Sequence, residues 1–306
     1  MNAPVPASER IQSLLAMAGL ESSGDVSLLG DGYEQWAFRA GDLVVRLPKD
    51  PERVEIAEKL RREVKLSRVI AGRLPAPVPE LTLHELADGT LFSIHRLIEG
   101  VPLWQLKRPL APGFGAAMGR FLRAQHTLPV DELSVVGLEV VDGDALRQRH
   151  IEAYEDIVRR VFPLISCEGR SHVAAVMESL INDRRSYDYQ PALVHADLDH
   201  RNVLADPETG ELAGVIDFGD AEIANPLSDY GEVDMAILRR FEAEGQLDDL
   251  LDGSGISRED VERRRGFSEV WWPLSDIRFG LDRREDDLVE AGIQALNEVV
   301  PFRTRC

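Results

Sequence analysis

Residues 191 to 220, PALVHADLDHRNVLADPETGELAGVIDFGD, form a β-rich segment between two long stretches of helical periodicity. Within it, VLAD and LAGVID are apolar runs joined by PETG, which predicts a hairpin. The hairpin would return the chain so that Asp197 and Asn202, just before it, meet Asp217 at its exit. Carboxylate and carboxamide oxygens are the hard ligands that Mg²⁺ prefers. The segment therefore predicts a fold that gathers these side chains at one point.

The spacing of these residues indicates a particular chemistry. Asn202 follows Asp197 by five residues, and the triplet DFG begins fifteen residues after Asn202. Protein kinases transfer phosphoryl groups with H-R-D-x-x-x-x-N followed by D-F-G. There the first Asp accepts the proton of the attacking hydroxyl, and the Asn and second Asp hold the metal. The two motifs in this order predict Asp197 as the catalytic residue and Asn202 and Asp217 as metal ligands.

The rest of the chain divides into two parts with different periodicity. Before residue 100, short alternating runs and turns predict three strands, one long helix and two further strands. From Pro112 onward, helical spacing dominates outside the β-rich segment. These patterns predict an α+β fold with a small N-terminal lobe, residues 1–99, and a larger helical C-terminal lobe, residues 100–306. Gly100 and Pro102 could form the hinge between the two lobes.

Two helix starts can be predicted within the N-terminal lobe. The segment SERIQSLLAMAGL has helical spacing, and Ser8 is a suitable N-cap. The long helix is expected to carry Pro51 in its first turn and to end near Gly72. In the C-terminal lobe, REDVERRRGFSEVWW is expected to be helical.

Composition excludes several classes of partner. The formal net charge is −19, from 54 acidic and 35 basic residues. Such a surface repels the phosphate backbone of nucleic acid and would attract cationic small molecules if the acids cluster. The sequence contains no apolar run long enough for a membrane span and no secretory signal pattern. We therefore expect a cytoplasmic monomer that binds neither nucleic acid nor membrane.

Residues upstream of the β-rich segment are candidates for nucleotide binding. Gly30 and Gly32 lie between two strand-like runs, which suits a flap over phosphates and equally a simple tight turn. Arg46 stands in the middle of the next strand, and Glu63 stands in the following helix. This order favours a phosphate-anchoring cation paired with an acid. Ile98 lies in the segment that would contact the base of ATP or GTP.

The sequence resembles the aminoglycoside phosphotransferase family from about Leu28 to Val299. LVHADLDHRNVL resembles the family's H-G-D-L-x-x-x-N-x-L, and GVIDFGDAEIANPLSDYGEV is similar to its I-D-F-G/W-x-x-A segment. The runs VVRLPKD, RREVKLSRVIAGRLPAPVPE, GDGYEQWAFRA and RAQHTLP also resemble family segments. The resemblance implies a protein-kinase-like two-lobed fold and a Mg²⁺-dependent phosphotransferase with an alcohol as acceptor.

The resemblance also implies roles for single residues. His195 would brace the catalytic loop, Asp229 would anchor it, and Arg46 oriented by Glu63 would contact the α and β phosphates. Ala196 departs from the family pattern, because a Gly is usual there and Ala is less adaptable. Arg46 and Gln35 also depart from it, since Lys and Asn are usual at these positions. The departures remove no required charge, so we expect an active kinase.

The residues that follow the DFG triplet indicate which class of molecule accepts the phosphoryl group. This region is rich in acids, and two adjacent tryptophans could stack on a sugar or bound a lactone. A polycationic aminoglycoside is the leading acceptor, a macrolide antibiotic follows, and a metabolic alcohol such as choline or homoserine remains open. The candidate substrate residues are Asp234, Glu269, Trp271, Trp272 and Asp276.

Alternatives from other classes remain. His195, Asp197, Asp199 and His200 are spaced almost as in a metallo-hydrolase zinc motif, but no histidine follows His200 to complete such a site. A pseudokinase would bind nucleotide without transfer, yet it should lack a key residue and all are present. A P-loop motif is absent, and the segment after DFG is short for a protein kinase. Asp199 and His200 are then expected at the loop surface.

Overall fold

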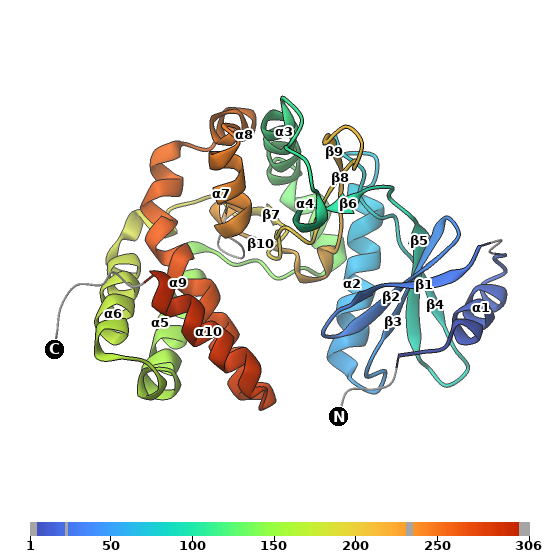
Figure 1. The fold of residues 1–306 in the computed structure, drawn as a ribbon, viewed down its shortest axis with the longest axis horizontal. Coiled ribbons are helices and arrows are strands. Elements are labelled where there is room, and N and C mark those ends of the chain that lie inside the picture. Colours follow the sequence, from blue (N-terminus) through green and yellow to red (C-terminus); the bar gives the residue numbers. More distant parts are fainter. Residues whose placement is uncertain (1–4, 22–23, 231–234, 300–306) are drawn as a thin grey trace.

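The computed structural model describes residues 5–21, 24–230 and 235–299, which form two lobes (Figure 1). The N-terminal lobe is built on a five-stranded antiparallel sheet of order β1-β2-β3-β5-β4. The helices α1 and α2 lie on opposite sides of this sheet (Figure 1). The predicted order of strands and long helix is confirmed. The elements are α1 (Ser8–Met17), β1 (Val26–Asp31), β2 (Gln35–Ala40), β3 (Leu43–Pro48), α2 (Val54–Ile70), β4 (Thr82–Glu85) and β5 (Leu91–Arg96).

Alternation along β3 decides where its charged residue points. Successive side chains of a strand face opposite sides of the sheet. Val45 and Leu47 are buried in the cluster that includes α1. Arg46 lies between them in sequence and therefore faces the side of α2, where Leu60 and Val64 are buried. A one-residue shift in the register of β3 would move its apolar side chains out of the core. The apolar pattern therefore fixes the face on which Arg46 lies.

The C-terminal lobe is mainly helical, as predicted, and its described residues form two large hydrophobic clusters and a small one around Val194. Helix α3 packs closely on α8 because glycines remove the side chains between them. A Cβ atom on Gly119 would lie 2.3 Å from the carbonyl oxygen of Leu250. The helices α9 and α10 lie side by side (Figure 1). The helices are α3 (Phe114–His126), α4 (Val130–Leu133), α5 (Gly143–Arg160), α6 (Cys167–Asn182), α7 (Met235–Ala243), α8 (Leu247–Ser254), α9 (Arg258–Arg283) and α10 (Asp286–Val299).

Short strands of the C-terminal lobe hold the candidate site. β7 (Ala192–Val194) pairs with β10 (Glu222–Ala224), and β8 (Val203–Ala205) forms the predicted hairpin with β9 (Leu212–Val215). β6 (Val101–Pro102) joins the hairpin as a third strand. Gly100 precedes β6 with φ +152°, and a Cβ atom there would lie 2.9 Å from the Cβ of Ala213. Only glycine therefore fits where the chain enters the second lobe.

Several predicted helix ends are wrong by a few residues. Ser8 is the first helical residue, and Ala7 occupies the N-cap without a side-chain hydrogen bond. Pro51 lies in a turn before α2, which begins at Val54. Helix α9 continues through Pro273 to Arg283, beyond the predicted segment. No helix in the described part of the chain combines the length and apolar character that a membrane span requires.

Candidate active site

The loop from residue 195 to 202 connects β7 to the hairpin, and the carboxylate of Asp199 within the loop stabilises its shape. Asp199 accepts hydrogen bonds from the backbone N–H of Arg201 at 2.7 Å and of Asn202 at 3.1 Å. It is 1% exposed, so the expected surface position of Asp199 is wrong. A short side chain that bonds the backbone two and three residues ahead stabilises a tight turn. Asp199 therefore shapes the loop that presents Asp197.

His195 lies beneath this loop with both ring nitrogens engaged. Its Nε2 lies 2.9 Å from the carbonyl oxygen of Ile216, and its Nδ1 lies 3.3 Å from the backbone nitrogen of Asp197. Because the carbonyl only accepts and the N–H only donates, these contacts assign the donor role to Nε2 and the acceptor role to Nδ1. The ring also packs on Phe218 at 4.5 Å between centroids. A zinc site of the metallo-hydrolase kind would need one of these nitrogens.

Asp229 anchors the start of the loop from the opposite side. Its Oδ1 accepts from the backbone N–H of His195 at 3.0 Å and of Ala196 at 3.2 Å. Its Oδ2 accepts from Gln125 at 2.7 Å and lies 2.9 Å from Nε2 of His126. The sequence alone assigns no role to Gln125 or His126, whose contacts with Asp229 become visible only in the fold. Their signal was the segment RAQHTLP, which ends α3.

Ala196 keeps the backbone conformation that a glycine would adopt. Its φ is +61°, in the left-handed region that L-residues rarely occupy. Such a conformation costs a residue with a Cβ atom about 1–2 kcal/mol. The surrounding hydrogen bonds to Asp229 hold the loop in this shape despite the cost.

The hairpin register brings the predicted metal ligands together. The backbone N–H of Ile216 donates to the carbonyl of Asn202 at 2.9 Å, so Asp217 follows directly beside Asn202. Nδ2 of Asn202 donates to the backbone carbonyl of Asp197 at 2.8 Å and to its carboxylate at 3.0 Å. Since both partners are acceptors, the amide orientation is fixed. Oδ1 of Asn202 is therefore the oxygen that remains to face a cation.

Arg46 connects the two lobes at this point. Its guanidinium donates to the carboxylate of Glu63 and, at 3.1 Å, to Oδ1 of Asp217. The side chains of Arg46 and Glu63 are 12% and 2% exposed. A planar fork can satisfy two carboxylates at once, which a lysine ammonium does less specifically. Burial raises the pKa of Asp217, but the nearby charges, with Arg46 the largest contributor, and a hydrogen bond from the backbone of Gly219 together hold that pKa below its ordinary value.

The carboxyl of Asp197 has a different electrostatic environment. Burial and, next, repulsion by Asp199 raise the pKa of Asp197 to about 6. This carboxylate is ionised at neutral pH and is more basic than an ordinary one. A general base is most effective when its pKa lies near the working pH.

The flap between β1 and β2 and the segment that joins the lobes both contact the C-terminal lobe. Gly30 lies on β1, and Gly32 begins the turn to β2, where a Cβ atom would lie 3.2 Å from the carbonyl of Gln35. The ring of Tyr33 contacts Phe279 of α9 edge-on at 4.8 Å, so the flap tip reaches the C-terminal lobe. Ile98 packs beside Gly214 of β9, where a Cβ atom would lie 2.8 Å from the Ile98 side chain.

A cavity of about 340 Å³ opens beside the catalytic loop. Its wall combines apolar, aromatic and charged side chains from α5, α9 and the strands. Burial, with Arg264 and Arg149 nearby, lowers the pKa of His150 to about 3, so this ring in the wall is neutral. The lining residues are Leu146, Arg149, His150, Ala153, Ala196, Glu222, Ser228, Trp271 and Arg278.

The predicted substrate residues have different positions relative to this cavity. Trp271 lines it, with its ring 4.9 Å from Phe267, whereas Trp272 is not part of its wall. Glu269 lies 3.7 Å from Arg239 in a partly exposed ion pair. Burial raises the pKa of Asp276, and the charge of Arg201 in the catalytic loop opposes this rise. Asp234 lies outside the described residues.

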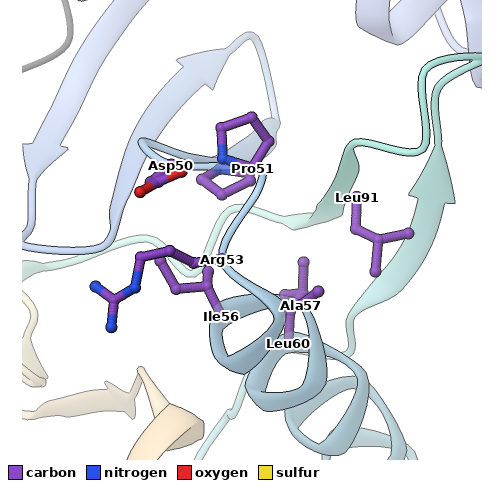
Figure 2. A pocket seen from close by; sticks show the side chains of 8 residues that line it. Asp50, Pro51, Arg53, Ile56, Ala57, Leu60 and Leu91 are labelled. Atoms are coloured by element: carbon purple, nitrogen blue, oxygen red, sulfur yellow. The ribbon is translucent and has the colours of Figure 1, made fainter.

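A second, much smaller pocket lies on the N-terminal lobe between the end of β3 and α2. In Figure 2, Leu91 of β5 lies opposite Ala57 and Leu60, and Arg53 points away from them. Its volume is about 10 Å³, which holds no more than a water molecule. It contains none of the predicted site residues.

No group of three or more His, Cys, Asp or Glu side chains is arranged to hold a metal ion among the described residues. A site of the kind expected for Mg²⁺ does not require one. Mg²⁺ is commonly held by one or two carboxylates together with substrate phosphates and water. Asn202 and Asp217 offer two protein oxygens of the appropriate chemistry.

The two lobes, the hairpin between the catalytic loop and the DFG segment, and the Arg46 bridge define a phosphotransferase with protein-kinase-like architecture. A family model described as the phosphotransferase enzyme family matches residues 25–267. The chain belongs to this family. No curated protein matches the sequence.

Solved structures of similar fold cover almost the whole chain. The GDP and kanamycin complex of APH(2″)-IIIa has a TM-score of 0.81 and 22% identity, over 95% of this chain and 98% of that chain. The GDP complex of wild-type aminoglycoside 2′-phosphotransferase-IIIa has a TM-score of 0.80 and 21% identity, over 96% and 98%. The macrolide 2′-phosphotransferase MphH from Brachybacterium faecium has a TM-score of 0.70 and 21% identity, over 97% and 100%.

The left-handed residue of the catalytic loop gives a prediction about stability. Ala196→Gly is expected to raise the free energy of unfolding by about 0.5–1 kcal/mol, because relief of the Cβ strain exceeds the entropy of the added glycine. Urea unfolding of both proteins measures the difference. Ala192→Gly is the matched control, since Ala192 is buried in the extended strand β7. The control should lower the same free energy, by about 1 kcal/mol. Equal destabilisation by both substitutions would contradict the left-handed conformation.

Proposed function

We propose that the protein transfers the γ-phosphoryl group of ATP or GTP to a hydroxyl of a small molecule. The observation that carries the proposal is the convergence of Asp197, Asn202 and Asp217 at one end of the hairpin, with Arg46 bonded to Asp217 from the other lobe. In this proposal residues 1–99 bind the nucleotide. Residues 100–306 supply the catalytic loop and the acceptor site.

Asp197 is the proposed catalytic residue. Its carboxylate accepts the proton of the acceptor hydroxyl as the oxygen attacks phosphorus, and Asn202 holds that carboxylate in place at 3.0 Å. The raised pKa of about 6 favours proton acceptance, while leaving the group ionised at neutral pH. Phosphoryl transfer depends mainly on positioning and charge neutralisation, which a fixed loop supplies.

Asn202 and Asp217 are the proposed ligands of Mg²⁺. The residues fit the ion, because Oδ1 of Asn202 is directed away from its own hydrogen-bond partners and the Asp217 side chain is 47% exposed. The ion would neutralise charge on the phosphates when bound. Arg46 donates a hydrogen bond to one oxygen of Asp217 and so holds the carboxylate where the nucleotide would arrive.

The nucleotide is proposed to lie between the flap and the hinge. Arg46, oriented by Glu63, would contact the α and β phosphates, and Gly30 and Gly32 would allow the flap backbone to approach them. Ile98 would lie against the base. Two of the structurally similar phosphotransferases were solved with GDP, which supports a nucleotide donor.

The leading acceptor is a polycationic aminoglycoside antibiotic. The formal net charge of −19 and the partly buried Asp276 near the catalytic loop support a cationic molecule. The solved relatives that bind kanamycin and gentamicin support it by analogy of fold. We infer that such a protein acts as a monomer in the cytoplasm and confers antibiotic resistance.

A macrolide is the second candidate, and the wall of the cavity favours it. Arg149 donates to Glu222 at 3.0 Å, and Arg278 donates to Asp156 at 2.9 Å. Glu222, the carboxylate in this wall, is therefore already paired with an arginine. Trp271 adds an aromatic surface beside apolar residues. Such a wall is also compatible with a large molecule that carries few charges.

Removal of either essential carboxylate tests the proposed chemistry. Asp197→Asn and Asp217→Asn are each expected to lower kcat by about 10²–10⁴-fold, because one loses the base and the other loses a metal ligand. A coupled nucleotide-turnover assay with a panel of aminoglycosides and macrolides measures the loss. Asp249→Asn, at an exposed position of α8, should leave kcat unchanged. Full turnover in both site variants would eliminate the mechanism. Inactivity of the natural sequence with every antibiotic would eliminate only the antibiotic assignment.

Substitution of the two adjacent tryptophans tests where the proposed acceptor site lies. Trp271→Leu should raise the KM for the acceptor by about tenfold or more, because it removes an aromatic surface from the cavity wall, and should leave the KM for nucleotide within about twofold. Trp272→Leu is the matched control, since Trp272 lies outside the wall. Steady-state kinetics with the active acceptor measure both constants. A larger effect at Trp272 would place the acceptor on another face of α9.

A further inference from the structure

Lys59 is a second, partly buried cation near the candidate site, and the proposed mechanism does not use it. It lies on α2 one turn before Glu63. Its Nζ lies 2.9 Å from Oε2 of Glu34 in the flap turn and 2.8 Å from Oδ1 of Asp220 after the DFG triplet. Lys59 is 21% exposed, and it joins three elements that surround the expected position of the phosphates.

The same lysine lies close to the groups of the phosphate site. A Cβ atom on Gly219 would be 3.0 Å from Cε of Lys59 and 3.4 Å from Oδ1 of Asp217. The glycine thus allows the lysine stem to pack beside the DFG turn. Burial favours a neutral amine, but Asp220 and Glu34 together raise the pKa of Lys59 well above its ordinary value. The ammonium is therefore charged in the folded protein.

The position of Glu34 makes this charge significant. Glu34 follows Gly32 by two residues, at the tip of the flap that would cover the triphosphate. An uncompensated carboxylate there would repel the phosphates, and Asp220 on the opposite side would add to the repulsion. Both carboxylates contact the same ammonium.

We propose that Lys59 is a positioning residue for the nucleotide, which neutralises Glu34 and Asp220 and so allows the acidic flap tip to lie over the phosphates. The inference rests on the proposed function. Charge masking by Lys59 and a simple structural tether between the flap and α2 predict different results for one experiment. If Lys59 masks charge, removal of the Glu34 charge should compensate for loss of the lysine. If Lys59 only ties the flap to α2, loss of either partner should have the same effect.

The experiment compares Lys59→Met, Glu34→Gln and the double variant in nucleotide kinetics with Mg²⁺. Lys59→Met is expected to raise the KM for nucleotide about tenfold with kcat lowered less than about threefold, because binding rather than chemistry is affected. Glu34→Gln should leave the KM unchanged or lower, and the double variant should return to within about threefold of the natural sequence. Lys59→Arg should retain most of the affinity. Lys65→Met, exposed on the same helix, is the matched control.

Salt provides an independent readout. The ratio of KM values between Lys59→Met and the natural sequence should decrease when the ionic strength rises from about 0.05 M to about 0.5 M, because screening weakens repulsion between exposed charges. A merely structural tether would leave this ratio unchanged. Thermal unfolding establishes that each variant is folded.

Defined outcomes overturn the inference. A folded Lys59→Met with unaltered KM, or a double variant no better than Lys59→Met, would contradict charge masking. If Lys59→Met does not fold, Glu34→Gln distinguishes the two interpretations. A raised KM for nucleotide in Glu34→Gln would indicate a tether, and an unchanged or lower KM would support charge masking. Failure of the proposed function is distinguishable, since the natural sequence would then neither bind Mg²⁺-nucleotide in calorimetry nor transfer phosphate.

Discussion

The candidate site depends on the pairing of the Arg46 guanidinium with the carboxylates of Glu63 and Asp217. A charge at 12% exposure is unfavourable unless it is paired and hydrogen-bonded. Glu63 and Asp217 provide the opposite charges and accept the hydrogen bonds, and these two residues come from different lobes. Loss of one member of such a buried set typically costs about 3–5 kcal/mol, because the remaining charges are left without a partner. The alignment of the sheet, α2 and the DFG segment is therefore tied to one side chain.

The second constraint is the anchoring of the catalytic loop. The buried carboxylate of Asp229 accepts hydrogen bonds from backbone N–H groups of the loop and from a side chain of α3. His195 connects the loop to the strand before the DFG triplet through Ile216. These contacts are strong enough to keep Ala196 in a left-handed conformation that costs about 1–2 kcal/mol. These hydrogen bonds restrain the loop, and in the proposed mechanism such restraint would reduce the reorganisation required for transfer.

Parts of the structure governed by local pattern could be predicted from the sequence. The hairpin followed from two apolar runs and a turn, and with it the convergence of Asn202 and Asp217. The order of the N-terminal strands followed from alternation and turns. The burial of Asp199 could not be predicted, because an acid that bonds its own backbone has the same sequence signature as an exposed one. The end of α9 was also missed, since tertiary packing tolerates Pro273 within a helix.

The cavity proposed as the acceptor site was the least predictable feature. Its wall is assembled from α5, α9 and the strand before α7, so residues far apart in sequence meet only in the folded chain. Composition suggested acids and tryptophans, but it could not separate Trp271 from Trp272. Helical phase directs one into the cavity and the other away from its wall. Charge counting likewise could not show that Glu222 is already paired with Arg149.

The most direct test of the central role of Arg46 is a double-mutant cycle on kcat/KM for the nucleotide. The cycle uses Arg46→Met, Glu63→Gln and the combined variant, each shown to be folded by thermal unfolding. If the bridge assembles the nucleotide site, the second substitution should cost little after the first, with a coupling energy of about 1.5 kcal/mol or more. Strictly additive effects would contradict this account, because they would mean that Arg46 and Glu63 act on the nucleotide independently.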